Sequence, residues 1–414
     1  MYKRNFVWNS IASIINAAEA VFMSMVVTRV TNISDAGVLA IAFAVGNLMS
    51  MIGKFGVRGF HVTDVRGCYS YSEYFKARCV SVLLMIFAVC LYGCFKWFVA
   101  KDSVIKIGCV LAICCIYCVE AVEDVIWGEC QRKDRLDLGA KLFIVRWISI
   151  FITFFFSMFF TRSLLLALWC SFAFSLISFI VAYRIIVLHE ISISMQKDGT
   201  SKLIQGDNVF EIMKKCTPLF VMNFLYFYIN NAAKYAIDDY GMNDEQAYYG
   251  FIAMPIFVIE LLNGMIYQPS VVRLTKMWVD GNISAFKLMV KKQFTLIVFI
   301  GIMCIVIVAV IGVPILSIIY NVCLSDYWVE LVLLQVAGLV LAMIGYLTVL
   351  LTVTRQQKWM MLFYFIVSVF AFIAMRSGVA MGGIKGTVVV HILCLVLLFV
   401  MKFLRFFIVV NVRK

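Results

Sequence analysis

The sequence predicts an all-α polytopic membrane protein with twelve transmembrane helices in two six-helix lobes. Hydrophobic residues make up 64% of the 414 residues and charged residues only 14%, a composition typical of membrane proteins rather than soluble domains. The mean hydropathy is +0.99. The apolar residues fall into runs of about 17 to 25, the length that an α-helix needs to cross a bilayer. One long polar connection divides these runs into two equal sets.

The apolar runs are separated by short polar breaks, which set the predicted ends of each span. In chain order the predicted spans are 6–28, 36–57, 79–100, 104–126, 139–161, 164–188, 213–237, 247–270, 294–319, 327–353, 359–375 and 382–409. The predicted domains are an N-lobe at 1–188, a cytoplasmic linker at 189–212 and a C-lobe at 213–414. Because six is an even number, the two lobes enter the membrane in the same orientation, as parallel repeats do.

The basic residues predict the orientation of the chain. Most of the 36 lysines and arginines lie in connections on the same side as the N-terminus, and we assign Lys54, Arg78 and Lys402 to that side. By the positive-inside rule both termini are then cytoplasmic. A net charge of +13 distributed in this way indicates membrane topology and excludes a nucleic-acid-binding face. The outer loops are short, which argues against an enzyme that acts on extracytoplasmic glycans.

Three predicted spans carry polar or small residues along one side of the helix. These residues are Asn9, Ala12, Ser13, Asn16, Glu19 and Ala20 in the first span; Asn223, Tyr226, Asn230 and Lys234 in the seventh; and Tyr249, Ala253, Glu260, Asn263, Gly264 and Tyr267 in the eighth. For the asparagines and serines, close helix packing and the lining of a polar cavity are both open. For Glu19 and Glu260 we favour a cavity, in which a carboxylate can couple transport to H⁺ or Na⁺.

Glu120 and Arg146 lie at similar depth in the fourth and fifth spans. Two interpretations are open: a structural salt bridge between them, or an arginine that presents its guanidinium to a phosphate-bearing ligand. We expect Glu123 and Asp124, closer to the cytoplasm, to be solvated.

Cysteine and histidine do not predict a metal site. Most of the 14 cysteines lie inside apolar runs, and the only close group, Cys114, Cys115 and Cys118, has no second CxxC or nearby histidine to complete a ligand set. We interpret the cysteines as small apolar side chains. No catalytic residue, metal ligand or cofactor is predicted, apart from H⁺ or Na⁺ as a coupling ion.

Several segments resemble a known family. They are the opening KRNFVWNSIASIINAAEAVFMSMVVTRVTNISDAGVLAIAF, VRGFHVTDVRG, VEAVEDVIWGECQRKDRLDLGAKLFIVRW, and NNAAKYAIDDY with YYGFIAMPIFVIELLNGMIYQPSVVRLTKMW. The chain resembles the polysaccharide transporters related to O-antigen (Wzx-like) and teichoic acid flippases, in the multidrug, oligosaccharidyl-lipid and polysaccharide (MOP) exporter superfamily. The resemblance covers nearly the whole chain.

The resemblance implies a MATE-like or MOP-like architecture, two six-helix lobes around a central cationic cleft. Residues that match the family's polar motif positions are Arg58, Asp64, Glu120, Asp124, Gln131, Arg146, Lys234, Tyr235 and Asp238. Two positions depart from the pattern: Ala233 replaces a proline, which removes a helix kink next to Lys234, and His61 replaces a glutamine.

We therefore predict a non-enzymatic flippase that moves an undecaprenyl-diphosphate-linked oligosaccharide or teichoic acid repeat unit to the outer leaflet of the bacterial cytoplasmic membrane. Its predicted partners are this lipid-linked glycan, membrane lipids and the glycan polymerase or ligase machinery, and it is predicted to be a monomer. The substrate-binding candidates are Arg146, Lys234, Arg58, Asn16, Asn223, Asn230 and Tyr235, and the coupling or gating candidates are Glu19, Glu260, Glu120, Asp124 and Asp238. The alternatives are a drug or metabolite antiporter of the same superfamily, a membrane glycan polymerase or acyltransferase, and a scaffold for that machinery.

Overall fold

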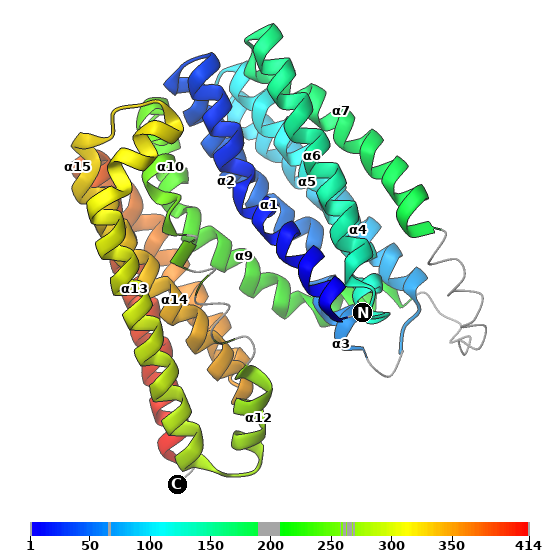
Figure 1. Cartoon of the computed structure of the whole chain (residues 1–414), viewed down its shortest axis with the longest axis vertical. Coiled ribbons are helices and arrows are strands. Elements are labelled where there is room, and N and C mark those ends of the chain that lie inside the picture. Colours follow the sequence, from blue (N-terminus) through cyan, green and yellow to red (C-terminus); the bar gives the residue numbers. More distant parts are fainter. Residues whose placement is uncertain are drawn as a thin grey trace. The chain divides into compact units, whose positions relative to one another are not determined.

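The chain folds into helices connected by short turns. The computed structural model describes residues 2–64, 68–188, 208–256, 258–259, 262, 267 and 270–412, without the side chains of residues 2, 3, 187, 188, 272 and 412. Its helices are α1 (Tyr2–Val30), α2 (Ile33–Lys54), α3 (Val57–Thr63), α4 (Tyr71–Phe98), α5 (Val104–Arg132), α6 (Leu136–Thr161), α7 (Leu164–Ala182), the π-helix η1 (Tyr183–Leu188), α9 (Val209–Asp239), α10 (Asn243–Ala253), α12 (Val271–Val279), α13 (Ile283–Tyr320), the 3₁₀-helix η3 (Ser325–Tyr327), α14 (Trp328–Val353) and α15 (Gln357–Val412) (Figure 1). The predicted all-α class is confirmed, and the described residues contain no strand.

Nine helices of the described chain are long and apolar enough to cross a membrane. One of them, α15, has 56 residues, about 84 Å of helix at 1.5 Å per residue and therefore enough for two crossings. Its backbone leaves helical geometry at Gly382 and Gly383, the first two residues of the predicted twelfth span. The protein is a multi-pass membrane protein, and large apolar side chains such as Phe160 (77% exposed) and Phe98 (73% exposed) point out of the bundle to where lipid would lie.

The described chain divides into two compact units, Met1–Phe224 and Leu225–Lys414. We call them the N-lobe and the C-lobe. The division falls within α9, a continuous helix of 31 residues that supplies its first half to one lobe and its second half to the other. The predicted linker, 189–212, lies mostly outside the described residues, so the predicted domain boundaries stay a prediction, as does the cytoplasmic location of the termini.

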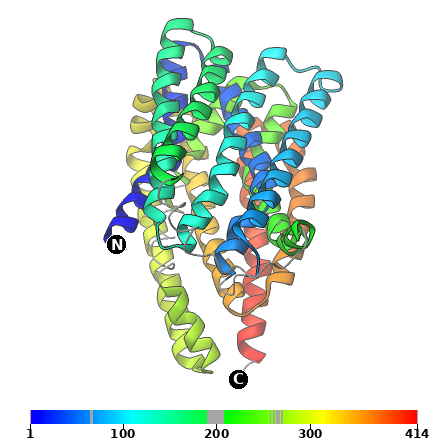
Figure 2. The same ribbon diagram turned by 90° about the vertical axis from the view of Figure 1, so that its right-hand side faces the viewer.

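In the N-lobe, α5 is the central helix and packs against α2, α4, α6 and α7 (Figure 2). One reason is its small and β-branched residues, including Ala112, Ala121 and Val125, which are fully buried and let neighbouring backbones approach. The first half of α9 also belongs to this lobe, where Phe220 stacks on Phe55 at 4.3 Å between ring centroids.

In the C-lobe, α14 packs between α13 and α15. The two halves of α15 fold back on each other at Gly382–Gly383, and next to this bend Gly378 and Gly386 bring their backbones into contact. A Cβ on Gly386 would collide with the carbonyl oxygen of Gly378. Glycine is therefore required there for the close approach.

Several helices begin or end at residues other than the predicted span boundaries, because capping interactions and turns set their ends. The fourth helix begins at Tyr71, eight residues before the predicted span, because Ser70 and Glu73 form a reciprocal capping box. The second ends at Lys54 because Phe55 and Gly56 take up positive φ angles, and the short helix α3, which we did not predict, follows. The predicted eighth span, 247–270, is described as α10 at its start, and its remainder, with Glu260, falls largely outside the described residues.

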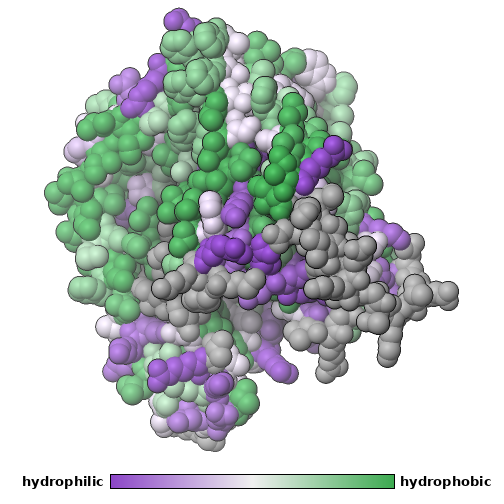
Figure 3. Space-filling model, turned by 45° about the vertical axis from the view of Figure 1, so that its right-hand side comes forward, coloured by the Kyte–Doolittle hydropathy of each residue, from purple (hydrophilic) through white to green (hydrophobic). Residues whose placement is uncertain are grey.

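Hydrophobic and hydrophilic side chains occupy different zones of the surface, as the alternation of apolar and polar segments in the sequence predicts. In Figure 3 hydrophobic side chains cover much of the upper part of the visible face, and hydrophilic side chains are concentrated lower. This banding is expected where one zone of the surface contacts hydrocarbon and another contacts water.

Candidate functional site: the buried charges of the two lobes

The N-lobe contains a buried group of charges that we call the central ion cluster: Glu19, Lys54, Glu120, Glu123 and Arg146. Arg146 of α6 is fully buried and donates to Glu123 Oε2 at 2.6 Å and to Glu120 Oε2 at 3.1 Å. Lys54 of α2 donates to Glu120 Oε1 at 2.9 Å. Because charges removed from water need partners, these contacts explain how α2, α5 and α6 hold ionised groups inside an apolar bundle.

Glu19 of α1 belongs to the same cluster through a tyrosine. The hydroxyl of Tyr117 donates to Glu19 Oε1 at 2.7 Å, and Tyr117 stands one helical turn before Glu120 on α5. The carboxylate of Glu19 is 8% exposed, and its second oxygen has no hydrogen-bond partner among the described residues. Glu19 thus takes part in the cluster without an ion pair of its own.

A second ion cluster lies beside it, where Asp124 joins two arginines. Arg78 of α4 donates to Asp124 Oδ2 at 2.7 Å, and Arg58 of α3 lies 3.4 Å from Asp124 Oδ1 and donates to Gln131 Oε1 at 2.9 Å. The Arg58 guanidinium also covers the Trp127 ring at 4.8 Å. The side chain of Arg58 is 29% exposed while that of Arg78 is fully buried, so of this pair Arg58 is the arginine that a ligand can reach.

Charge counting shows what the central ion cluster can do. Three carboxylates, Glu19, Glu120 and Glu123, face two cations, Lys54 and Arg146. An uncompensated carboxylate is costly inside a membrane protein, and the second ion cluster beside it supplies the compensation: Asp124 there faces two arginines, Arg58 and Arg78, so the two clusters together are neutral when every group is ionised. Glu19 is the carboxylate of the central ion cluster that has no ion pair within the described residues.

The C-lobe holds lysines in a different environment. Lys234 of α9 is partly buried, and within the described residues no carboxylate lies at ion-pair distance from its Nζ. It acts electrostatically on His391 of α15, whose Nδ1 lies 2.9 Å from the hydroxyl of Tyr249 on α10. One turn before Lys234, the side-chain oxygen of Asn230 is buried and has no hydrogen-bond partner in the described structure. This part of the C-lobe therefore combines a cation with neutral polar groups, and the buried carboxylate of Asp238 stands one helical turn beyond Lys234 without forming an ion pair with it.

Lys402 is the second buried lysine of the C-lobe. It is fully buried, and its Nζ donates to Tyr364 Oη at 2.7 Å and to Thr348 Oγ1 at 2.8 Å. The ammonium also lies 4.3 Å from the centroid of the Tyr364 ring. Both acceptors are neutral, and no carboxylate of the described chain pairs with this lysine.

The structure places the predicted site residues in several environments. It brings together Glu19, Glu120 and Arg146, and the predicted pair of Glu120 with Arg146 is present, with Glu123 as a second partner. Glu123 is only 1% exposed, so the expectation that it is solvated was wrong: α6 covers it and Arg146 neutralises it.

The other candidates do not join the central ion cluster. Asn16 and Asn223 are exposed, so the predicted polar side of the first span is buried at Glu19 and open at Asn16. Tyr235 stacks on Tyr228 at 5.8 Å, and Asp238 is 6% exposed. Arg58 and Asp124 form the second ion cluster, Asn230 and Lys234 lie in the C-lobe, and Glu260 lies outside the described residues.

Sequence reasoning missed Lys54, Arg78 and Lys402 as interior residues. We assigned all three to cytoplasmic connections, and this was wrong for Arg78 and Lys402, which are fully buried. Lys402 stands inside the predicted span 382–409, and a lone lysine within an apolar run is itself a signal of a buried site. Lys54 also stands inside a predicted span, 36–57, but only three residues from its end, where cations are common. For Arg78, which precedes the predicted span 79–100, no such signal exists.

Comparison with known proteins identifies the fold. No family model and no curated protein matches the sequence. Among solved structures, the chain is similar to an inward-facing MATE multidrug resistance transporter of the MOP superfamily (TM-score 0.68, 11% identity, covering 96% of this chain and 95% of that one) and to the lipid II flippase MurJ in an inward closed conformation (TM-score 0.70, 12% identity, 97% and 87%). It is also similar to the MATE transporter VcmN of Vibrio cholerae (TM-score 0.61, 11% identity, 98% and 95%).

The chain has the fold of the MATE transporters and MurJ. This confirms the predicted architecture of two helical lobes. At 11–12% sequence identity, this similarity identifies the fold of the chain but does not identify its substrate.

Proposed function

We propose that this protein is a flippase that moves a polyprenyl-diphosphate-linked oligosaccharide or teichoic acid repeat unit from the inner to the outer leaflet of a bacterial cytoplasmic membrane. The observation that carries the proposal is the state of Lys234, a partly buried cation with no carboxylate at ion-pair distance in the described chain. A cation held this way favours an anionic ligand over a cationic one. The fold supports transport by alternating access, as its neighbours are transporters and a flippase by name.

The central ion cluster supplies the coupling in this proposal. Glu19 has no ion pair, and its Oε2 is unbonded within the described structure, so Glu19 is the carboxylate that we assign to H⁺ or Na⁺. Arg146 is engaged with Glu120 and Glu123, so we assign the first contact with the diphosphate to the partly exposed Arg58 rather than to Arg146.

The test is translocation by the purified protein in liposomes. A fluorescent polyprenyl-diphosphate-linked sugar is placed in the inner leaflet, and its arrival outside is followed by quenching with an impermeant reductant. Lys234→Gln should lower the rate about tenfold or more, since it removes a charge-assisted contact to phosphate. Lys385→Gln, which removes an exposed lysine of the same lobe, is the matched control and should leave the rate unchanged.

Equal translocation rates for the wild-type protein and Lys234→Gln would contradict the proposal that Lys234 binds the diphosphate of the substrate. Export of a cationic dye with no movement of the lipid-linked sugar would replace the flippase by the drug antiporter, which has the same fold. Absence of both activities would favour a scaffold for the glycan machinery.

A further inference from the structure

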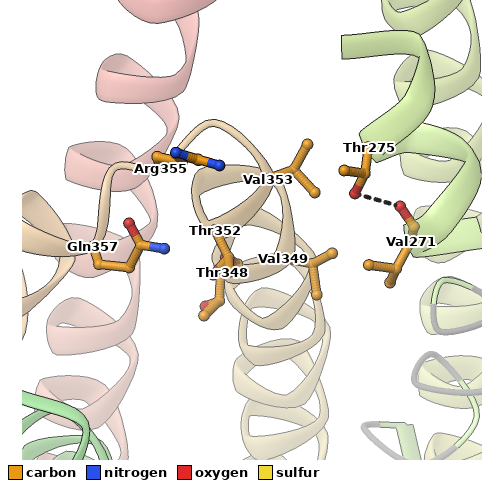
Figure 4. A pocket seen from close by; sticks show the side chains of 8 residues that line it. All are labelled: Val271, Thr275, Thr348, Val349, Thr352, Val353, Arg355 and Gln357. Carbon is orange, nitrogen blue, oxygen red and sulfur yellow. Dashed lines mark hydrogen bonds between the residues drawn. The ribbon is translucent and has the colours of Figure 1, made fainter. Parts of the chain in front are cut away.

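The C-lobe contains a pocket at the end of α14. It has a volume of about 420 Å³ and is lined by Val271 and Thr275 of α12, by Thr348, Val349, Thr352 and Val353 of α14, and by Arg355 and Gln357 at the turn into α15. In Figure 4, Thr275 and Val271 face Val349 and Val353 across the pocket, while Arg355 lies at the turn beyond the last residues of α14. Apolar walls with a few polar groups are typical of ligand sites.

Among the described residues that line this pocket, Arg355 is the only charged one. Its side chain is exposed, and it makes no ion pair or side-chain hydrogen bond in the part of the chain that the structure describes. Arg355 has φ +57°, a left-handed backbone that holds it at the turn. Guanidinium is the side chain best matched to phosphate oxygens because it donates two parallel hydrogen bonds.

Lys402 adds a second positive charge behind the wall of the pocket. Thr348 lines the pocket and accepts a hydrogen bond from Lys402 Nζ at 2.8 Å. The Thr348 hydroxyl donates in turn to the carbonyl of Ile344, so it leaves the positive charge of Lys402 uncompensated. A buried lysine with neutral partners raises the electrostatic potential in the adjoining pocket and favours an anion there.

The surroundings strengthen this potential. Lys287 of α13 lies 3.4 Å from the side-chain oxygen of Asn411 and Arg405 donates to Gln356, so the start of α13, the turn before α15 and the end of α15 lie at one end of the lobe (Figures 1 and 2). Asp280 is the one acidic residue in the described segments 270–292, 353–358 and 402–411. The basic residues of these segments, besides Arg355 and Lys402, are Arg273, Lys276, Lys287, Lys291, Lys292, Lys358 and Arg405.

We propose that this pocket is a phosphate-binding site, in which Arg355 binds the phosphate directly and Lys402 stabilises its charge through Thr348. The site is separate from Lys234, since Lys402 lies eleven residues, or about 16 Å of helix, beyond His391 on α15. Its ligand is a phosphate ester that carries a lipid chain: the apolar residues Val271, Val349 and Val353 are placed to contact the first carbons of the chain.

This proposal does not depend on the flippase activity. The phosphate can come from an anionic membrane lipid or from the diphosphate of a lipid-linked substrate, and the two sources share the same recognition chemistry. The experiment below separates them by its choice of probe.

Binding can be measured by calorimetry on the detergent-purified full chain at fixed ionic strength. The probes are inorganic pyrophosphate, farnesyl diphosphate and short-chain phosphatidylglycerol. We expect farnesyl diphosphate or phosphatidylglycerol to bind more tightly than pyrophosphate, and the tighter of the two lipids identifies the source. Arg355→Asn, chosen because asparagine tolerates a positive φ, should raise the Kd about tenfold, and Lys402→Met several-fold.

Lys358→Gln is the matched control, because Lys358 is exposed and three residues from Arg355 but does not line the pocket. It should change the Kd less than twofold. The proposal is overturned if no probe binds the wild-type protein, or if Arg355→Asn and Lys358→Gln weaken binding equally. A thermal melt of each variant establishes that it is folded. If Lys234→Gln loses translocation but still binds the phosphate probes at the Arg355 pocket, the pocket is distinct from the translocation function that we assign to Lys234.

Discussion

The two lobes treat buried charge in opposite ways. In the N-lobe the buried cations Arg78 and Arg146 are bonded to carboxylates, whereas in the C-lobe Lys402 is bonded only to hydroxyls. Paired charges hold helices together and neutralise one another. Unpaired charges contribute little to cohesion and remain available to attract an anion. The difference shows that buried cations are neutralised by carboxylates in the N-lobe, while Lys402 in the C-lobe keeps its charge among neutral partners.

The largest expected effect comes from breaking the N-lobe pairing. Arg146→Met leaves Glu120 and Glu123 buried without their shared partner, which costs about 3–5 kcal/mol. We expect a strong fall in thermal stability and in the yield of folded protein, measured by size-exclusion chromatography after heating. Arg162→Asn, which removes an exposed arginine at a positive φ, should leave both unchanged.

The pairing can also be tested by compensation. Adding Glu123→Gln to Arg146→Met removes one of the stranded charges and should recover part of the lost stability. A double variant less stable than Arg146→Met alone would show that Glu123 is held by something other than the arginine.

The second effect concerns transport rather than stability. Glu19→Gln keeps a side-chain oxygen for the Tyr117 hydroxyl and removes the carboxylate of the central ion cluster that has no ion pair. We expect a folded protein of equal or higher thermal stability whose translocation rate falls about tenfold or more and no longer responds to a pH or Na⁺ gradient. If Glu19→Gln responds normally to both gradients, Glu19 is not the coupling residue.

Removing a buried positive charge from the C-lobe should have a much smaller effect on stability than Arg146→Met has in the N-lobe. Lys402→Met keeps the aliphatic stem and removes an ammonium that has no carboxylate partner in the described chain, so we expect the thermal stability to stay within about 1 kcal/mol of wild type or to rise. A loss as large as that of Arg146→Met would erase the difference between the lobes.

The smallest effect is expected at Asp64, outside the membrane-spanning helices. Partial burial would raise the pKa of this carboxyl, but hydrogen bonds from Cys68 N, the Tyr74 hydroxyl and Tyr69 N outweigh it and hold the pKa below its usual range. Asp64→Asn should cost less than about 1 kcal/mol at pH 7, since solvent screens the site.

The pH dependence of this effect follows from the lowered pKa. The stabilisation is present above the unfolded pKa, about 3.9, and is lost as the pH falls through the lower folded value. Thermal melts of the wild-type protein and Asp64→Asn should therefore converge below about pH 4. A difference that grows in acid would contradict this assignment.

The sequence by itself determined the class of the protein and most of its membrane helices. Apolar runs and polar breaks are local properties, so the spans 104–126 and 139–161 lie within α5 and α6, and the span 327–353 matches α14 except for its first residue. The pair of Glu120 and Arg146 was predictable for a similar reason, because two helices joined by a short turn place residues equidistant from that turn at the same depth.

Only the tertiary structure decided which charges are paired. Lys54, Arg78 and Arg146 come from three helices and meet the carboxylates of α5 through packing that no local pattern encodes. Likewise, Lys402 is buried because α15 folds back at Gly382–Gly383. Its ammonium then meets Thr348 of α14 and Tyr364 in the first half of α15. The apolar pattern places a charge along a helix, but the neighbouring helices determine whether it meets a carboxylate, a hydroxyl or a ligand.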